Sequence, residues 1–165
     1  MQVTFKGTPM TLIGQPLKPG EQMPGFTLCG PELEKVESEM LTGSKVFLSV
    51  PSLDTGVCDA QVRRFNQAAA AFRGVTVYAV SMDLPFAQAR WCGAAGVERV
   101  RVLSDFRERE FGKATGTLIK ELGLLTRAVF VVDGQGRLTH VEYVGEVAQH
   151  PDYDAALAAI HALQG

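Results

Sequence analysis

Residues 46–65 read VFLSVPSLDTGVCDAQVRRF, and this stretch decides the expected fold. Residues 46–50 are a short apolar run that Pro51 stops, which is typical of a buried central strand. Beyond a short loop, apolar side chains recur at helical spacing, as at Val62 and Phe65. The stretch therefore predicts a strand, a loop and a helix in succession, with the loop at one end of a sheet.

Further strands and helices are predicted on both sides of this unit. Apolar runs and turn residues indicate strands at residues 26–29, 75–80, 100–103, 128–132 and 138–144. Helical spacing indicates helices from Pro85 to about Gly93, over 107–114 and over 152–163. The N-terminus alternates as a small β-hairpin around a Gly7-Thr8-Pro9 turn. Residues 15–25 are expected to be a loop, 31–39 a solvated acidic segment, and 133–136 a hairpin turn.

This order of elements predicts one α/β domain over residues 1–165. Alternating strands and helices imply a sheet covered by helices. The late hairpin implies that part of the sheet is antiparallel, so the sheet is mixed. We expect a thioredoxin-like fold with an additional N-terminal β-hairpin.

The composition excludes several classes of function. The chain has 165 residues, of which 46% are hydrophobic and 21% charged, and a formal net charge of -2. Such a charge gives no reason to expect binding to nucleic acid or to a membrane surface. No apolar run is long enough to span a bilayer, and the N-terminus lacks a signal-peptide pattern. The expected location is cytoplasmic.

Cys29, Cys58 and Cys92 are the only cysteines. An odd, low number argues against a structural disulfide framework, and disulfides in a reducing cytosol are mostly transient and catalytic. The sequence contains no CxxC motif and no Cys/His cluster at zinc spacing. We therefore expect thiol chemistry if the cysteines have a function, with no metal site and no cofactor.

Cys58 is the strongest candidate nucleophile because it is expected in the first turn of a helix, with Thr55 as the N-cap. The first turn has unpaired backbone N–H groups, and the helix dipole there favours negative charge. Both effects favour the thiolate, which is the reactive form. Position alone leaves the alternative that Cys58 is a small buried residue without a catalytic function.

The motif Pro-x-x-x-Thr-x-x-Cys, present as Pro51, Thr55 and Cys58, resembles the active-site signature of the peroxiredoxins. The longer string 51–58 resembles the bacterial thiol peroxidases, which are atypical two-cysteine peroxiredoxins. The similarity covers nearly the whole chain and continues at residues 64–66, 83–88, 92–93, 103–107, 127–133 and 151–157, and at Gly7-x-Pro9.

The resemblance implies a role for each of five residues. Cys58 is the peroxidatic cysteine, which becomes a sulfenic acid, and Cys92 is the resolving cysteine. Thr55 offers its hydroxyl to the peroxide, Pro51 shields the thiolate from water, and Arg127 supplies a fixed positive charge. Taken singly, Thr55 can be only a helix cap, Pro51 only a strand terminator, and Arg127 only a surface or salt-bridge residue.

Resolution by Cys92 implies movement. A disulfide requires Cα atoms within about 7 Å, and two cysteines on separate helices rarely lie that close. We therefore expect local unwinding around both cysteines. Cys29 matches no position of the family and is expected to be a non-catalytic thiol. Phe86 and Trp91 are expected to be packing residues, with a border of the peroxide entrance as the alternative.

The resemblance thus implies a thiol peroxidase that reduces hydrogen peroxide and organic hydroperoxides through a Cys58–Cys92 disulfide. It also implies thioredoxin as the reductant and a homodimer packed near the active-site loop and residues 104–107. Two other functions use the same thiols. A non-enzymatic peroxide sensor or redox relay shares the chemistry, whereas a disulfide oxidoreductase is disfavoured by the missing CxxC motif.

Overall fold

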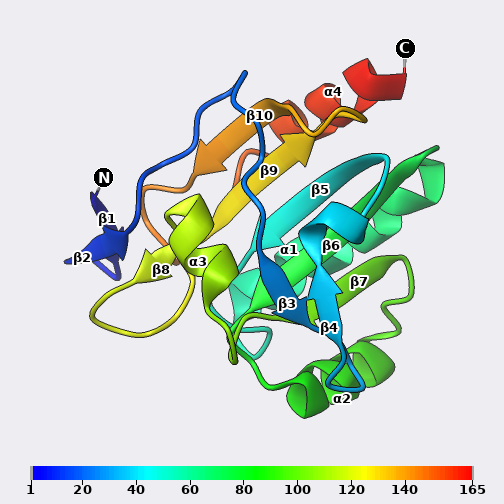
Figure 1. Cartoon of the computed structure of the whole chain (residues 1–165). Helices are drawn as coiled ribbons and strands as arrows, with labels where there is room; N and C mark the ends of the chain where they lie inside the picture. Colours follow the sequence, from blue (N-terminus) through cyan, green and yellow to red (C-terminus); the bar gives the residue numbers. More distant parts are fainter. Residues whose placement is uncertain (1, 165) are drawn as a thin grey trace.

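The computed structural model describes residues 2–164 (Figure 1). Its strands are β1 (Gln2–Phe5), β2 (Thr8–Ile13), β3 (Thr27–Cys29), β4 (Lys35–Glu37), β5 (Ser44–Ser49), β6 (Val75–Ser81), β7 (Val100–Ser104), β8 (Leu118–Ile119), β9 (Ala128–Val132) and β10 (Leu138–Tyr143). Its helices are α1 (Gly56–Ala68), α2 (Pro85–Ala95), α3 (Glu110–Thr115) and α4 (Tyr153–Gln164), with 3-10 turns η1 (Ser38–Met40) and η2 (Ala69–Ala71).

A seven-stranded sheet in the order β10-β9-β5-β6-β7-β3-β4 forms the centre of the fold. The strands β5, β6 and β7 are parallel, whereas β9 pairs antiparallel with β5 and β3 antiparallel with β7. The predicted α/β architecture with a mixed sheet is confirmed. The apolar run of β5 fits its central position, because both faces of the sheet are covered there and the strand is buried on each of them.

One face of the sheet is covered by α1, α2 and α4. Alternate residues of β5, including Val46 and Leu48, point to this face and pack with Val62 and Phe65 of α1 and Ile160 of α4. Cys58 is a buried member of the same cluster, and Cys92 packs against it. Both candidate cysteines therefore lie on the same side of the sheet.

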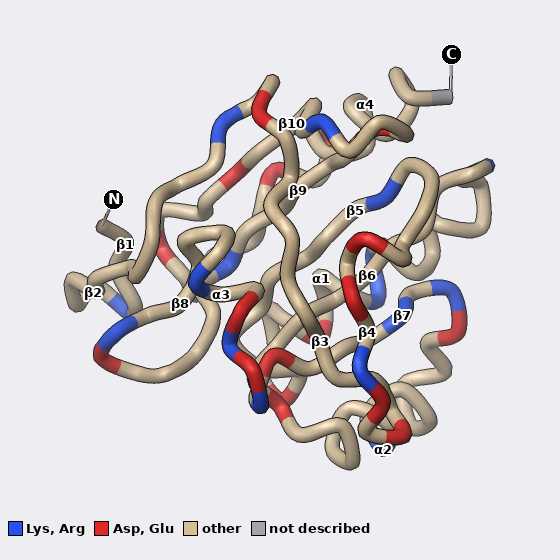
Figure 2. The backbone as a smooth tube through the Cα atoms, viewed as in Figure 1, with Lys and Arg blue, Asp and Glu red and all other residues tan. Residues whose placement is uncertain are grey.

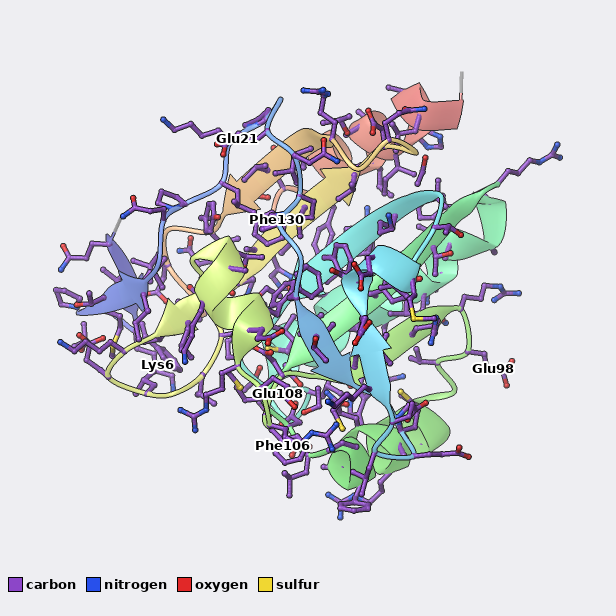
Figure 3. The ribbon with its side chains drawn as sticks, in the orientation of Figure 1. Lys6, Glu21, Glu98, Phe106, Glu108 and Phe130 are labelled. Atoms are coloured by element: carbon purple, nitrogen blue, oxygen red, sulfur yellow. The ribbon has the colours of Figure 1, made fainter. Side chains whose placement is uncertain are left out.

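The other face is covered by α3 and by the long loops that lead to β3 and β9. Phe47, which alternates with Val46 and Leu48 along β5, packs here with Phe130 of β9 and Phe111 of α3. Phe130, labelled at the centre of Figure 3, lies with its ring 6.4 Å from that of Phe111. This aromatic layer holds α3 on the sheet without any contribution from the cysteines.

The N-terminal β-hairpin is confirmed and joins β8 in a separate three-stranded sheet. The predicted turn, residues 7–9, was misplaced: the observed turn begins one residue earlier and ends two residues earlier. The turn is Lys6-Gly7, with φ values of 50° and 82°, while Thr8 and Pro9 already pair within the hairpin. Two successive residues with positive φ form the tight turn whose twist suits a hairpin.

Two short strands were not predicted. β4 lies within residues 31–39, expected to be solvated, and is an edge strand with the charged residues Lys35 and Glu37. Charged side chains protect such an edge from pairing with other chains, and they also hide it from a hydrophobic pattern. β8 has only two residues, which is too short for any periodicity to appear.

Two predicted helix boundaries were also wrong. α2 continues past Gly93 to Ala95 and ends at Gly96, whose φ of 68° gives a left-handed C-cap. α3 begins at Glu110 instead of at residue 107. Asp105 accepts hydrogen bonds from the backbone N–H groups of Phe111 and Gly112, so this carboxylate fixes the start of the helix.

Lys and Arg are interspersed with Asp and Glu along the chain, as Figure 2 shows. Within the described residues, no helix has both the length and the apolar character needed to cross a bilayer.

Candidate active site

The sheet topology brings Cys58 and Arg127 together. β5 and β9 are antiparallel, with Ser49 at the end of β5 opposite Ala128 at the start of β9. The loop that leads to α1 begins where β5 ends, and Arg127 immediately precedes Ala128, where β9 begins. A further hydrogen bond from the Ser49 hydroxyl to the Thr126 carbonyl, at 2.8 Å, ties the two ends together.

Arg127 is a buried cation with only 1% of its surface exposed, and each of its three guanidinium nitrogens donates a hydrogen bond. Its Nη2 donates to Sγ of Cys58 at 3.2 Å, its Nη1 to Oε1 of Gln61 at 2.7 Å, and its Nε to the carbonyl of Val147 at 2.8 Å. These bonds fix the plane of the guanidinium. The cation is therefore held against the Cys58 sulfur and is not free to turn towards water.

Cys58 is the third residue of α1 and is fully buried. The first backbone bond of the helix runs from Asp59 N to Thr55 O, so the N–H groups of residues 56–58 precede the intrahelical ladder. Their partial positive charge and Arg127 act on the same sulfur atom. Both interact favourably with negative charge that develops on the sulfur.

Thr55 occupies the N-cap position of α1 in an extended conformation, but its side chain makes no capping hydrogen bond. Its hydroxyl donates instead to the carbonyl of Ser52, at 3.1 Å. The hydroxyl proton is thus committed inside the loop, and the oxygen lone pairs remain able to accept a hydrogen bond.

A pocket of about 250 Å³ opens beside these residues. Its lining combines the active-site loop, Arg127 and the N-terminal hairpin, through Phe5, Lys6, Pro51, Thr55, Gly56, Val57, Arg127, Val147 and Ala148. Pro51 is buried and forms part of the apolar wall. Phe86 and Trp91 do not line this pocket. Phe86 is 66% exposed, so its prediction as a packing residue was wrong, whereas Trp91 packs against the core.

Gln61 also contacts Arg127, although the sequence analysis did not single it out. Gln61 is fully buried, one helical turn after Cys58 on the inward face of α1, and its carbonyl oxygen accepts from Arg127. Its Nε2 has no hydrogen-bond partner within residues 2–164. The sequence did contain one indication of Gln61: it is a polar residue three positions after Cys58, on the face of the helix that otherwise carries apolar residues.

Asp83 braces the active-site loop from the neighbouring strand. Its carboxylate accepts from the Ser52 hydroxyl and from the Leu53 backbone N–H, both at 2.8 Å, and from the Ser81 hydroxyl at 2.7 Å. Asp83 lies within one of the matching strings, but its function as a brace becomes visible only once β5 and β6 are paired.

Comparison with known proteins now assigns the family. The Redoxin family model matches residues 18–157. The thiol peroxidase of Bacillus subtilis is 52% identical over 163 residues, which cover 98% of each chain, and that of Clostridium acetobutylicum is 51% identical over 162 residues, covering 98% of this chain and 99% of the relative. A crystal structure of a peroxiredoxin-like protein from Aquifex aeolicus superposes with a TM-score of 0.90 at 38% identity, covering 98% and 96% of the two chains.

The chain belongs to the redoxin family, among the thiol peroxidases. The predicted resemblance and the predicted fold class are thereby confirmed. The matches span nearly the full length of the thiol peroxidases named above, so they include both the strand–loop–helix unit and α2.

In this thiol peroxidase fold, Cys92 lies on α2 and is half-buried, with a free thiol. Burial raises the pKa of the Cys92 thiol above its ordinary value. Cys92 lines a second pocket, of about 360 Å³, between α2 and β7. Cys58 and Cys92 are thus on separate helices, and the structure shows both as free thiols.

Cys29 lies in β3, opposite Ser104 of β7, and is 1% exposed. Its thiol faces the carbonyl of Gly30, 3.7 Å away. Across residues 2–164 there is no group of three or more His, Cys, Asp or Glu side chains that could hold a metal ion.

Proposed function

We propose that the chain is a peroxidase in which the Cys58 thiolate reduces hydrogen peroxide and organic hydroperoxides. The observation that carries this proposal is the contact of 3.2 Å between Arg127 Nη2 and Cys58 Sγ inside a buried site. A cation that is almost fully buried stabilises a thiolate and the charge that develops during the reaction more strongly than an exposed one. Membership of the thiol peroxidases supports the same activity.

In the first step, Sγ of Cys58 attacks the terminal oxygen of R–O–O–H. An S–O bond forms, the O–O bond breaks, and the remaining R–O oxygen leaves with the electron pair and takes up a proton as the alcohol or water. Cys58 becomes a sulfenic acid. Arg127 is placed to stabilise the negative charge on the sulfur before attack and on the leaving oxygen during it.

Thr55 and Pro51 orient the peroxide in this scheme. The Thr55 hydroxyl donates to Ser52 O, so its oxygen can accept the O–H proton of a hydroperoxide. Pro51 lines the pocket beside it and lacks an N–H group, so it offers water no donor there. The apolar wall and the two polar partners together leave the peroxide one productive orientation.

In the second step, the Cys92 thiol attacks the sulfur of the sulfenic acid. An S–S bond forms between Cys58 and Cys92, the S–O bond breaks, and the oxygen leaves as water with the thiol proton. Because Cys58 is fully buried within α1 and Cys92 lies on α2, both helices must unwind locally. Similar Cα separations in reduced and oxidised crystals would count against this movement.

A thioredoxin-type dithiol then reduces the Cys58–Cys92 disulfide by thiol exchange, which completes the cycle. We place the protein in the cytoplasm, where such dithiols are available. We also propose a homodimer that packs through the active-site loop and residues 104–107. Size-exclusion chromatography with light scattering tests the dimer, and a monomer at micromolar concentration would exclude it.

The decisive experiment compares peroxide turnover in the wild type, Cys58→Ser, Cys92→Ser and Cys29→Ser, with thioredoxin, thioredoxin reductase and NADPH. Cys58→Ser is expected to be inactive. Cys92→Ser is expected to react once per site and then stall or overoxidise, and Cys29→Ser to retain full activity. Full activity of Cys58→Ser would overturn the proposal. Slow turnover of the wild type, with oxidation of a partner protein instead, would favour a redox relay.

A further inference from the structure

A hydrogen bond connects the residues next to the two catalytic cysteines. Asp59 directly follows Cys58 in the first turn of α1, and Trp91 directly precedes Cys92 in α2. The indole Nε1 of Trp91 donates to Oδ1 of Asp59 at 2.9 Å. The segment that carries the attacking thiol is thus tied to the segment that carries the resolving thiol.

Arg63, one turn further along α1, strengthens this tie. Its Nε donates to Oδ2 of Asp59 at 2.8 Å, so the carboxylate binds both α2 and its own helix. Its Nη1 donates to the carbonyl of Ala95 at 3.3 Å, and its guanidinium lies 5.8 Å from the centre of the Trp91 ring. Trp91 and Ala95 are four residues apart, so α2 is held at two points one helical turn apart.

The hydrogen bonds of Asp59 and Arg63 to α2 are incompatible with the Cys58–Cys92 disulfide. The connection runs through a complete indole side chain and a carboxylate, which keep the two helix backbones apart. A disulfide draws the Cα atoms of Cys58 and Cys92 to within about 7 Å and requires both segments to leave helical geometry. Asp59 and Trp91 lie inside those segments, so their hydrogen bond must break before the S–S bond forms.

We propose that Asp59 is a positioning residue that sets how fast Cys92 reaches the Cys58 sulfenic acid. This inference rests on the proposed peroxidase function. While α2 stays docked, Cys58 remains in its helical turn. Its contact with Arg127 rests on the bonds of Arg127 to Gln61 and to the Val147 carbonyl, which do not involve Asp59. The same docking delays the second step, so Asp59 determines how long the sulfenic acid is exposed to more peroxide.

That delay has a chemical consequence. A sulfenic acid that meets a second R–O–O–H takes up one more oxygen and becomes a sulfinic acid, releasing R–OH. A sulfenic acid that meets the Cys92 thiol becomes a disulfide and releases water. The fraction of sulfinic acid formed per turnover therefore measures the competition that Asp59 is proposed to control.

Asp59→Ala removes the acceptor of both Trp91 and Arg63 and is expected to speed disulfide formation about three- to tenfold. The effect is modest because the Asp59 and Arg63 side chains are 33% and 46% exposed, so water screens their attraction. The sulfinic acid fraction should fall by the same factor. Asp59→Asn keeps an oxygen for Trp91 but loses the charge that binds Arg63, and should lie between the wild type and Asp59→Ala.

Trp91 is the single tryptophan of the chain, so its fluorescence reports directly on the release of α2. The experiment is stopped-flow mixing of reduced protein with one equivalent of peroxide, followed by mass spectrometry of Cys58. Attack by Cys58 and the later fluorescence change of Trp91 give two separate rate constants. Asp59→Ala should alter the second and leave the first unchanged. A redox titration of Asp59→Ala should give a more negative reduction potential for the Cys58–Cys92 disulfide than that of the wild type. The expected difference is about 30 mV for a tenfold effect.

Glu98→Ala is the matched control, because Glu98 is an exposed carboxylate that follows α2 and its side chain has no hydrogen-bond or ion-pair partner among the described residues. Trp91→Phe removes the hydrogen bond from the other side and is followed by mass spectrometry, so a poorly folded Asp59→Ala would not end the test. An unchanged or slower second step in both Asp59→Asn and Trp91→Phe would overturn the role of Asp59. Absence of the first step in the wild type would instead overturn the peroxidase function.

Discussion

Nη2 of Arg127 lies 3.2 Å from Sγ of Cys58, although the two residues are 69 positions apart in the sequence. Both side chains are withdrawn from solvent, and Arg127 is the largest fully buried side chain of the described residues. A buried guanidinium needs partners for its donors, and here one of those partners is a sulfur atom. A buried cation costs stability unless its donors have partners, and negative charge that develops on the Cys58 sulfur during the reaction lies directly against this one.

Replacing Arg127 by Lys is therefore expected to slow the reaction of Cys58 with peroxide about 10²–10³-fold. Lysine keeps the positive charge but cannot donate simultaneously to Cys58, Gln61 and the Val147 carbonyl as the planar guanidinium does. The measurement is the second-order rate constant for the first oxidation, in a Cys92→Ser background. Arg99→Lys is the control, because Arg99 is exposed. If the rate constant of Arg127→Lys falls by less than about threefold, the planar geometry of the guanidinium is unimportant for the first step.

Gln61 is expected to matter for stability as well as for rate. Gln61→Leu leaves Nη1 of Arg127 without its acceptor in a buried site, which should lower the free energy of unfolding by about 1–3 kcal/mol. The rate of the first step should fall about tenfold, because the guanidinium is no longer held in its plane. Urea denaturation and stopped-flow measurements test the two effects. Gln61→Glu retains an acceptor oxygen and should recover most of the stability, and equal losses in both variants would contradict this interpretation.

The sequence allowed the strand–loop–helix unit to be predicted because its apolar pattern is local. The apolar run of β5, the loop that follows Pro51 and the inward face of α1 all follow directly from residues 46–65. The place of Arg127 did not follow from a local pattern. It depends on the antiparallel pairing of β5 with β9, which sets Ser49 opposite Ala128 and which no run of residues indicates.

The contacts of single polar side chains could not be predicted from the sequence, for a related reason. Gln61, Asp83 and Asp59 look like ordinary helix or loop residues, and each acts through a partner on another element. Their partners are set by the packing of α1 against α2 and by the pairing of β5 with β6 and with β9. Predicting them requires the distances between elements, whereas hydrophobic periodicity fixes only which face of each element is buried.

The N-terminal hairpin is expected to depend on one carboxylate. Glu146 accepts from the backbone N–H groups of Ala148, Gly7 and Lys6 and from the Thr4 hydroxyl, at 2.8–3.1 Å, and these hydrogen bonds lower its pKa to about 2. A lowered pKa means that this attachment is complete above the ordinary pKa of a glutamate and is lost as the pH falls towards 2.

Glu146→Gln at pH 7 should therefore raise the hydrogen-exchange rates of the Lys6 and Gly7 amides about tenfold. NMR-detected exchange measures this, with Glu21→Gln as the control. Glu21 is an exposed residue of the loop after the hairpin, and it lies well away from Lys6 in Figure 3. Unchanged protection of Lys6 and Gly7 in the Glu146 variant would show that the strand pairing alone holds the turn.

Asp105 is expected to make the stability of the fold depend on pH in the opposite direction. This carboxyl is 1% exposed, and burial raises its pKa to about 6 despite hydrogen bonds from the backbone N–H groups of Gly112 and Phe111. Because the folded state holds the proton more tightly than the unfolded state, the free energy of unfolding should fall as the pH rises from about 4 to about 6.

The size of this effect follows from the raised pKa of Asp105. Each tenfold gain in proton affinity on folding corresponds to about 1.4 kcal/mol, which gives about 3 kcal/mol between the ordinary pKa of an aspartate and the pKa of about 6 in the folded protein. Asp105→Asn cannot ionise, so it lacks this dependence while sharing every other titrating group with the wild type. Urea denaturation at pH 4, 5, 6 and 7 should show the wild type losing about 3 kcal/mol relative to the variant between the lowest and highest pH.

Asparagine offers only one acceptor oxygen to the two backbone N–H groups, which adds a constant offset between the two proteins at every pH. The test therefore lies in how the difference in unfolding free energy changes with pH, because the offset cancels when two pH values are compared. A difference that stays constant from pH 4 to pH 7 would mean that Asp105 is already ionised throughout this range in the folded state. The two backbone hydrogen bonds to its carboxylate would then outweigh its burial.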